Sequence, residues 1–350
     1  MRFLKLLCLL VFIVLIGAVF KFFSIPLAYL FASIIGTLLF IRIIDNDIYF
    51  PKPFANSGVF VMGIQIGTSF TLPAIIKMTD DWYNIVIITI LTLMLALLLS
   101  IPFRYLTNST IETAVLASVP GALSQMIIMA EENKNADLML VSLTQTSRIV
   151  FIVILVPMIT HFSQSTSVSK ITEVPNLSEV FSVYMLLIPI AGYVMYRLLR
   201  RIKFPAAILL GPMVPTIVWN LITEAPFTLD FVLIAFAQIL FGIRIGMQIT
   251  TLFSQLSLRD ICAIVIQNIG LICGSMILVI IYTMFTSHEF TSLFLAAAPG
   301  GLAQIIVVAM ESGGDIAMIS SYHLFRIFFI ILIVVPIVHY LLMRPRAQKS

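Results

Sequence analysis

One short motif occurs twice in this sequence, each time inside a long apolar segment. Residues 118–125 read Ser-Val-Pro-Gly-Ala-Leu-Ser-Gln, and residues 297–304 read Ala-Ala-Pro-Gly-Gly-Leu-Ala-Gln. Proline removes a backbone hydrogen-bond donor, and glycine accepts backbone angles that other residues resist. Each copy therefore predicts a break in a helix, and two such breaks are the first constraint on the fold.

The sequence offset that carries Pro120 onto Pro299 also holds far from the motif. Gly-Ile-Gln-Ile-Gly at 63–67 corresponds to Gly-Ile-Arg-Ile-Gly at 242–246, and Glu132 corresponds to Glu311. Asp137 with Asp315, and Arg148 with Arg326, slip by one residue. One offset over most of the chain predicts two repeats of one unit, a duplication common in secondary transporters. The predicted organisation is a first membrane repeat, an extracytoplasmic linker, a second membrane repeat and a cytoplasmic basic tail, at residues 1–170, 171–179, 180–342 and 343–350.

Composition predicts an all-α integral membrane protein. Hydrophobic residues make up 61% of the chain and charged residues 10%, with a mean hydropathy of +1.12. The apolar runs are continuous over roughly 20 residues, whereas barrel strands alternate over about 10. No hydrophilic stretch is long enough for an ordinary nucleotide-binding or DNA-binding domain, so no nucleic-acid partner is expected. Twelve apolar segments are predicted, near residues 3–20, 25–44, 55–76, 84–103, 111–131, 138–161, 180–199, 204–221, 228–252, 261–285, 290–311 and 316–342.

The distribution of basic residues tests how many segments cross the bilayer. If the Pro-Gly segment of each repeat enters and leaves on the same side, fourteen basic residues fall in cytoplasmic loops and three outside, in agreement with the positive-inside rule. Five crossings per repeat make the two repeats inverted and place both termini in the cytoplasm. The count does not identify the non-crossing segment, since assigning it to the segment around Gly63 and Gly242 gives thirteen against four. The Pro-Gly segment is then a full crossing that is unwound in the middle.

The broken helices and the two arginines are the predicted substrate site. A half-helix end and the freed backbone groups of a break attract ions, and an arginine at membrane depth normally faces a cavity or a partner. Guanidinium can also bind a carboxylate bidentately. The alternatives are a proline kink that only shapes the bundle, and arginines that pair with acidic residues or cap the carbonyl end of a broken helix. The predicted substrate-binding residues are Pro120, Gly121, Gln125, Arg148, Pro299, Gly300, Gly301, Gln304 and Arg326.

Acidic residues at segment ends, together with one histidine deep in a segment, are the candidates for coupling to protons or sodium. They are Glu132, Asp137, Glu311, Asp315 and His323. The alternative for the acids is that they are solvated caps of helices, and for His323 that hydrogen bonds satisfy it. The three cysteines lie in apolar segments without metal-ligand spacing and the four histidines are scattered, so no metal, cofactor or catalytic residue is expected.

The duplicated motif, with an acidic turn and a following arginine helix, resembles the AbrB-type family of bacterial membrane proteins over nearly the whole chain. The resemblance rests on residues 120–125 with Arg148 and residues 299–304 with Arg326. A soluble DNA-binding regulator bears the same name and is a different protein. Members of the membrane family are described as regulators of gene expression and as ammonia monooxygenases, and the family is distantly similar to antiporters and symporters with inverted repeats.

These observations together predict a secondary transporter in the bacterial cytoplasmic membrane. It would move a small anionic organic solute by alternating access, driven by a proton or sodium gradient. A membrane-embedded sensor that affects gene expression indirectly is the alternative. Small-residue faces such as Gly63-xxx-Gly67 and Gly242-xxx-Gly246 permit close helix packing, either within the chain or between the subunits of a homodimer.

Overall fold

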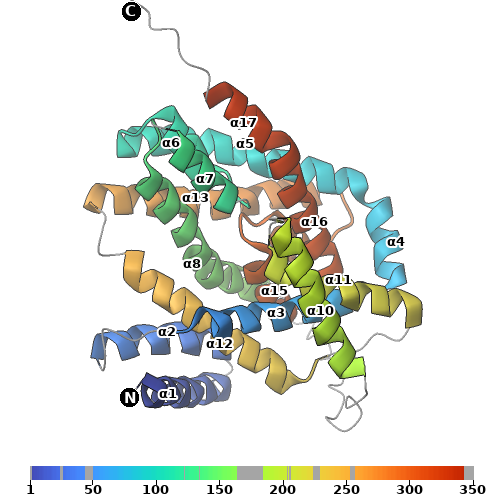
Figure 1. Ribbon diagram of the computed structural model, residues 1–350. Coiled ribbons are helices and arrows are strands. Elements are labelled where there is room, and N and C mark those ends of the chain that lie inside the picture. Colours follow the sequence, from blue (N-terminus) through green and yellow to red (C-terminus); the bar gives the residue numbers. More distant parts are fainter. Residues whose placement is uncertain are drawn as a thin grey trace, which may run out of the picture. The chain divides into compact units, whose positions relative to one another are not determined.

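A computed structural model describes most of the 350-residue chain (Figure 1). The described residues are 2–23, 27–43, 50–121, 123–133, 135–163, 184–202, 204, 206–223, 229–252 and 257–342. Within these ranges the chain forms α-helices, one short π-helix and no strand. The predicted linker at 171–179 and the predicted tail at 343–350 lie outside the described residues.

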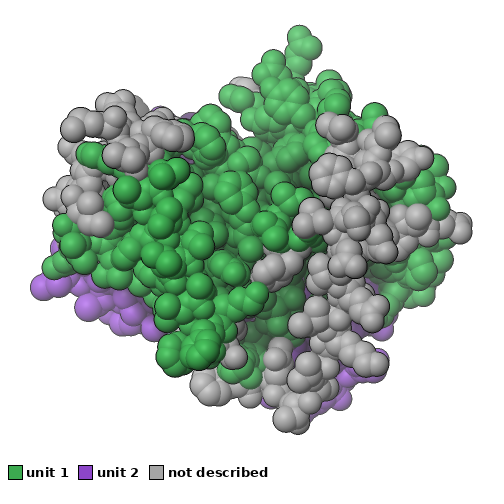
Figure 2. Space-filling model, turned by 90° about the horizontal axis from the view of Figure 1, so that it is seen from below, with its two compact units in different colours: residues 1–80, 157–254, 306–318 green, residues 81–156, 255–305, 319–350 purple. Residues whose placement is uncertain are grey.

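The chain divides into two compact units, which Figure 2 colours green and purple. Unit 1 comprises residues 1–80, 157–254 and 306–318, and unit 2 comprises residues 81–156, 255–305 and 319–350. Helices wholly in unit 1 are α1 (Arg2–Phe22), α2 (Ala28–Ile43), α3 (Lys52–Thr68), α4 (Leu72–Asp80), α10 (Tyr184–Arg201), α11 (Ala207–Thr223) and α12 (Phe231–Leu252). Those wholly in unit 2 are α5 (Trp82–Thr107), α6 (Ile111–Ser118), α7 (Leu123–Glu132), α13 (Leu258–Thr283), α14 (Phe290–Ala297), the π-helix η1 (Ile330–Val334) and α17 (Val335–Leu342). The division falls within α8 (Leu138–Ser163), α15 (Leu302–Ser312) and α16 (Ile316–Phe329). Each unit draws elements from both halves of the sequence, and the predicted repeat boundaries stay a prediction.

Six of the described helical stretches are long and apolar enough to cross a membrane. They lie at Lys5–Phe22, Trp82–Thr107, Leu138–His161, Val232–Thr250, Leu258–Thr283 and Ile316–Val338. The 26-residue helix α5, for example, is about 39 Å long at 1.5 Å per residue. Three shorter apolar helices, at Ala28–Ile43, Ala207–Thr223 and Leu302–Ser312, accompany them. The chain is therefore a multi-pass helical membrane protein, while the number and inversion of the crossings stay predictions.

Two predicted segments differ from the structure in their continuity. The segment near 55–76 is two helices, because α3 ends at Thr68 and α4 begins at Leu72 with a bend of 80° between them. Pro73 is the second residue of α4 and has no N–H to donate to the carbonyl of Ser69, so the helix hydrogen bonds cannot run on from α3 into α4. The segment near 316–342 stays helical but widens to η1 between α16 and α17.

The glycine pairs of unit 1 pack helices within this one chain. A Cβ placed on Gly63 of α3 would overlap the carbonyl oxygen of Leu209 in α11. A Cβ on Gly242 of α12 would overlap the hydroxyl of Ser33 and lie 2.8 Å from the carbonyl oxygen of Leu30, both in α2. The backbones approach so closely that only glycine fits at either position. These glycines therefore join α3 to α11 and α12 to α2 within the chain.

Candidate functional site

The first helix break lies between α6 and α7 in unit 2. Helix α6 ends at Ser118, Val119 is extended, and Gly121 has a φ of +97°, which L-residues with a side chain rarely adopt. Helix α7 then begins at Leu123. The helix therefore breaks at the Pro-Gly pair, as the sequence predicts, and the last carbonyls of α6 need partners from outside the helix.

Arg148 of α8 supplies those partners. Its Nη2 donates to the carbonyl oxygens of Ala117 at 2.7 Å and Ser118 at 3.1 Å, and its Nη1 donates to that of Val119 at 3.3 Å. The side chain is only 3% exposed. A cation at the carbonyl end of a helix also interacts favourably with the helix dipole. Of the alternatives that the sequence leaves open, capping of the broken helix is the one that these contacts describe.

Gln145, one turn before Arg148, completes this cap. Its Nε2 donates to the carbonyl oxygens of Leu116 and Val119, both at 2.8 Å. Its Oε1 accepts a hydrogen bond from Nη1 of Arg148 at 3.0 Å. The side-chain amide thus links the arginine to the end of α6.

The second break, between α14 and α15, has the same plan. Helix α14 ends at Ala297, and α15 begins at Leu302. Arg326 of α16 donates through Nη1 to the carbonyl oxygen of Ala297 at 3.3 Å and through Nη2 to that of Gly300 at 3.2 Å. Its side chain is 2% exposed. The break and the arginine that follows it are therefore in contact in each copy of the motif.

His323 occupies the place in the second break that Gln145 occupies in the first. Its Nδ1 lies 2.5 Å from Nη2 of Arg326, and its Nε2 lies 2.9 Å from the carbonyl oxygen of Leu295. Because guanidinium can only donate and a carbonyl can only accept, Nδ1 is the acceptor and Nε2 carries the proton. The contacts hold the imidazole as the neutral Nε2–H tautomer, in agreement with the alternative that hydrogen bonds satisfy this histidine.

The two breaks approach one another inside unit 2. A Cβ built on Gly121 of the first break would lie 3.6 Å from Nε of Arg326 and 3.3 Å from Cδ1 of Ile330. A Cβ on Gly300 of the second break would lie 3.0 Å from Cδ1 of Ile152 in α8. The Nε atoms of Arg148 and Arg326 are buried, and neither has a hydrogen-bond partner in the described part of the chain. The two motifs, far apart in sequence, thus share one region.

The other predicted substrate-binding residues line the breaks to different degrees. Pro120 and Pro299 are buried, whereas Gln125 of α7 and Gln304 of α15 are half-buried. A Cβ on Gly301 would overlap Oε1 of Gln304, so the glutamine side chain turns back over the break. Their role in binding stays a prediction.

The acidic candidates for ion coupling lie at helix ends. Asp137 accepts from the backbone N–H of Leu140 at 3.0 Å in the first turn of α8. Asp315 accepts from that of Met318 at 3.0 Å in the first turn of α16, and it lies 3.5 Å from the ammonium of Lys77. Both contacts are helix caps, one of the two alternatives from the sequence. The remaining two are exposed: Glu132 ends α7, and Glu311 accepts from the backbone N–H of Leu27.

Two polar residues of α13, outside the site predicted from the sequence, contact the first break and the helix α8 that caps it. Gln267 donates to the hydroxyl of Ser118 at 2.8 Å, and Asn268 donates to the hydroxyl of Ser147 at 3.1 Å. Both amide side chains are buried, at 2% and 0% exposure. The available signal was a Gln-Asn pair inside an otherwise apolar helix, since polar residues at membrane depth usually face a partner.

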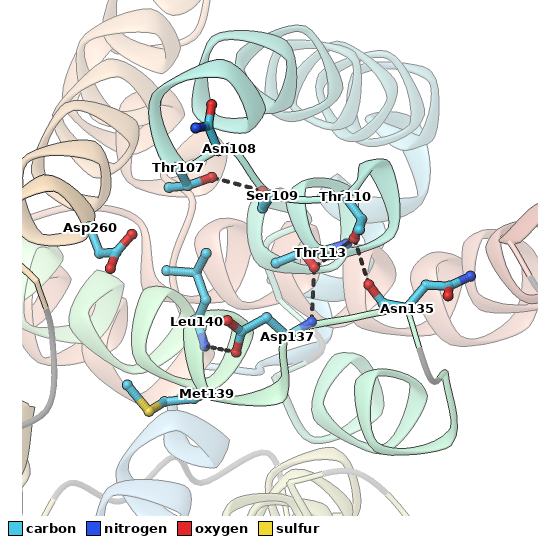
Figure 3. A pocket seen from close by; sticks show the side chains of 10 residues that line it. All are labelled: Thr107, Asn108, Ser109, Thr110, Thr113, Asn135, Asp137, Met139, Leu140 and Asp260. Carbon is cyan, nitrogen blue, oxygen red and sulfur yellow. Dashed lines mark hydrogen bonds between the residues drawn. The ribbon is translucent and has the colours of Figure 1, made fainter.

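A pocket of about 310 Å³ lies at the end of α5, beside the start of α6 and α8 (Figure 3). In Figure 3 the hydroxyls of Thr110 and Thr113 bond to the segment before α8, at the carbonyl oxygen of Asn135 and the backbone N–H of Asp137. Asp260, from the first turn of α13, lines the opposite side. The pocket is hydroxyl-rich and holds one predicted ion-coupling residue, Asp137.

The fold and the site together define a class of protein: a multi-pass helical membrane protein with two arginine-capped helix breaks. A family model described as Transition state regulatory protein AbrB matches residues 29–342. The chain belongs to this AbrB family.

Two bacterial relatives match over most of their length. A protein of Bacillus subtilis (strain 168) named "Uncharacterized protein YhjN" is 23% identical over 313 residues, which cover 84% of this chain and 80% of the relative. A protein of Escherichia coli (strain K12) named "Putative regulator AbrB" is 24% identical over 313 residues, 88% of each chain. The family match includes both breaks and both arginines of this chain.

Proposed function

We propose that this protein is a secondary transporter that moves a small anionic organic solute across the bacterial cytoplasmic membrane by alternating access. In this proposal the two broken helices and the two arginines surround one substrate site, a proton or sodium gradient drives the cycle, and both termini are cytoplasmic. The main support is that two buried guanidinium groups, one beside each break, lie in the same region of unit 2. The Nε–H of each has no hydrogen-bond partner among the described residues.

The arrangement of helices supports two inverted repeats, the architecture of many transporters. Helix α6 at 111–118 and α14 at 290–297 are related by the same offset as the two prolines, as are the starts of α7 and α15. The same offset relates the two glycine contacts of unit 1 to one another. Gly63 contacts Leu209, and their counterparts in the other copy, Gly242 and Leu30, contact each other as well. In such repeats a discontinuous helix from each half lines the binding site, and irregular backbone at membrane depth lines a cavity or is buried.

The charge in this region supports an anionic substrate. Two arginines converge, while within the described residues neither guanidinium contacts a carboxylate. Carbonyl oxygens and the imidazole of His323 accept hydrogen bonds from Nη1 and Nη2, but these neutral acceptors leave a full positive charge on each group. A carboxylate is the ligand that neutralises this charge with directional hydrogen bonds.

The test is a thermal-stability screen of the purified protein against small organic anions. Because alanine would remove the helix caps together with the charge, we choose Arg148→Lys and Arg326→Lys, which keep the charge and lose the planar fork. A ligand at about 100 times its dissociation constant stabilises the folded state by roughly 2.7 kcal/mol. We expect at least one anion to raise the melting temperature of the wild type and to have a much smaller effect on both variants.

Arg259 provides a matched control, since it also donates to backbone carbonyls, those of Leu106 and Tyr105, but is exposed and lies outside the breaks. Arg259→Lys should retain the full anion effect. A shift that is equal in all three lysine variants, or the absence of any shift across the screen, would contradict the arginine site. Uptake of the stabilising anion into liposomes then tests transport itself.

A membrane-embedded regulatory protein is the second candidate, favoured by the name of the Escherichia coli relative, which describes a regulator. It predicts ligand binding or a protein partner without solute flux, so the liposome measurement separates the two candidates. The proposal assigns the chain no enzymatic activity. Metal analysis of the purified protein tests that part, and stoichiometric copper or iron would contradict it.

A further inference from the structure

A cluster of side chains in unit 2 converges on Asp81, the residue directly before α5. The Asp81 carboxylate makes no cap on its own helix. Instead, Oδ1 accepts hydrogen bonds from Nε2 of His288 at 2.8 Å and Nδ2 of Asn84 at 2.6 Å, and Oδ2 accepts one from the hydroxyl of Tyr322 at 2.6 Å. Neither the coupling residues expected from the sequence nor the two breaks include this cluster.

The hydrogen bonds fix which atom of His288 can exchange a proton. Nε2 of His288 lies 2.8 Å from Oδ1 of Asp81 and 3.2 Å from Nδ2 of Asn84. Because an ionised carboxylate only accepts, and Asn84 already donates to the same oxygen, Nε2 of His288 carries a hydrogen. Tyr282 donates to Oδ1 of Asn84 at 2.6 Å, which keeps Nδ2 of that amide directed at Asp81. Nδ1 of His288 is the ring atom that gains or loses a proton. The side chains of His288 and Asp81 are 18% and 12% exposed, so water can reach the pair.

The groups around this pair set its charge balance. Asp81 directly precedes α5, and Tyr83 lies in the first turn of that helix. Tyr282 of α13 and Tyr322 of α16 lie within electrostatic range of both. Glu289, next to His288, is exposed. In the described part of the chain, His288 is the one basic side chain bonded to Asp81. The pair is thus an anion when His288 is neutral and has no net charge when His288 is protonated.

The cluster is connected to the second break at two points. His288 lies two residues before α14, the half-helix whose end is capped by Arg326. Tyr322 directly precedes His323, which bonds both Arg326 and the carbonyl oxygen of Leu295. A change of charge at Asp81 and His288 therefore acts on both helices that hold the second break.

We propose that Asp81 and His288 form the proton-binding site of the transport cycle, and that Tyr322 transmits its state to the break at Arg326. The lone pair of His288 Nδ1 takes one proton from water, the imidazole becomes a cation, and it forms an ion pair with Asp81. The carboxylate of Asp81 is then paired with a cation, so its hydrogen bond from Tyr322 weakens and holds α16 less strongly. If the Pro-Gly segments are the non-crossing ones, the distribution of basic residues places residues 81 and 288 on the outer side of the membrane. The inference rests on the proposed transport function for its role, but not for the existence of the site.

The test follows the ring nitrogens of the full-length protein labelled with ¹⁵N-histidine in lipid nanodiscs. The His288 signal is identified by its absence from His288→Gln. A histidine ordinarily changes charge between pH 5 and 8. We expect the His288 signal to change from the neutral to the imidazolium pattern as the pH falls, and this change to differ in Asp81→Asn, which lacks the carboxylate bonded to the ring. A His288 that stays neutral at pH 5, or that titrates unchanged in Asp81→Asn, overturns the site.

Asp260 is the matched control, because it is the counterpart of Asp81 in the second copy of the duplicated sequence and lies in the first turn of α13, as Asp81 lies at the start of α5. Asp260→Asn should leave the titration of His288 unchanged, and an equal effect of the two substitutions would overturn the assignment. The link to the break is read from His323. Its signal should shift at the pH at which His288 titrates, and this shift should vanish in His288→Gln and in Tyr322→Phe. Persistence of the shift in either variant overturns the link.

This titration needs no substrate, so its result is separate from that of the anion screen. If His288 titrates with Asp81 as expected and no anion binds or moves, the proton site stands and the transport function fails. If an anion binds through the arginines and His288 does not titrate, the transport proposal stands and this proton site is overturned.

Discussion

In both helix breaks of unit 2 an arginine caps the helix end, but the second capping side chain differs between them. In the first, Arg148 and the amide of Gln145 contact the carbonyls at the end of α6; in the second, Arg326 and the imidazole of His323 contact those of α14 and its connection. Gln145 bonds Leu116, and His323 bonds Leu295, the counterpart of Leu116 in the second copy. The arginine donates to three carbonyls in the first break and to two in the second, so the first break is the more firmly capped. The second break lies beside the proposed proton site at Asp81 and His288.

Arg148→Ala should give the largest effect and show how much the cap of the first break contributes. It leaves three carbonyls, two at the end of α6 and that of Val119 directly after it, without their charged donor, and we expect a loss of about 3 kcal/mol of stability. Arg326→Ala should cost less, because Arg326 donates to two carbonyls. Thermal unfolding in detergent compares the two variants. A larger loss in Arg326→Ala would invert the comparison.

Gly121→Ala should follow, at about 2 kcal/mol, because a Cβ is strained at a φ of +97°. Gly300→Ala is the matched variant in the second break. Gly300 is not among the residues with a positive φ, and its added Cβ meets only the flexible end of Ile152 at 3.0 Å and the side chain of Ile305. The melting temperature should fall further for Gly121→Ala. Equal losses would show that backbone conformation does not distinguish the breaks.

Exchanging the two capping residues tests the comparison directly. Gln145→His should cost about 1.5 kcal/mol, since the imidazole can donate to one of the two carbonyls that Gln145 now serves. His323→Gln, the reverse change, should keep the bond to Leu295 and cost less. Unfolding measurements on both variants check the ranking, and a greater loss in His323→Gln would show that the imidazole has a structural role that an amide cannot fill.

The smallest effect should come from Gln267→Leu, at about 1 kcal/mol, because Ser118 loses one hydrogen-bond donor while the side-chain volume is retained. The corresponding position in α5, in the first copy of the duplicated sequence, is Ile88, which is already apolar. Ile88→Leu is thus a control that should leave the melting temperature nearly unchanged. If the melting temperature fell by a comparable amount in both variants, the effect would come from packing and not from the lost hydrogen bond.

The sequence predicts local features of this protein well. Both breaks, the helical membrane class and the family follow from Pro-Gly pairs, apolar runs and a repeated motif, all of which act over a few residues. Capping by Arg148 was one of several open alternatives, because the choice between a carbonyl and a carboxylate partner depends on how α8 lies against α6. The same holds for Asp137 and Asp315, which are helix caps in the structure.

The pairings across helices could not be predicted in this way. Asp81 and His288 are 207 residues apart, and Gln267 and Ser118 are 149 apart. Nothing in the local sequence of either partner identifies the other, and an aspartate before a helix is usually read as a cap. The sequence leaves the segment around Gly63 open as a non-crossing one but does not locate the break between α3 and α4, because its proline lies within a continuous apolar run.

The close glycine contacts of unit 1 have a consequence for how the protein is made. Gly242 packs on Ser33, which is synthesised much earlier, and Gly63 packs on Leu209. At about 5 to 20 residues per second, α2 is complete roughly 10 to 40 s before its partner α12 leaves the ribosome. The first half of the chain therefore waits in the bilayer with its small-residue faces against lipid, and unit 1 assembles only after the second half has been inserted.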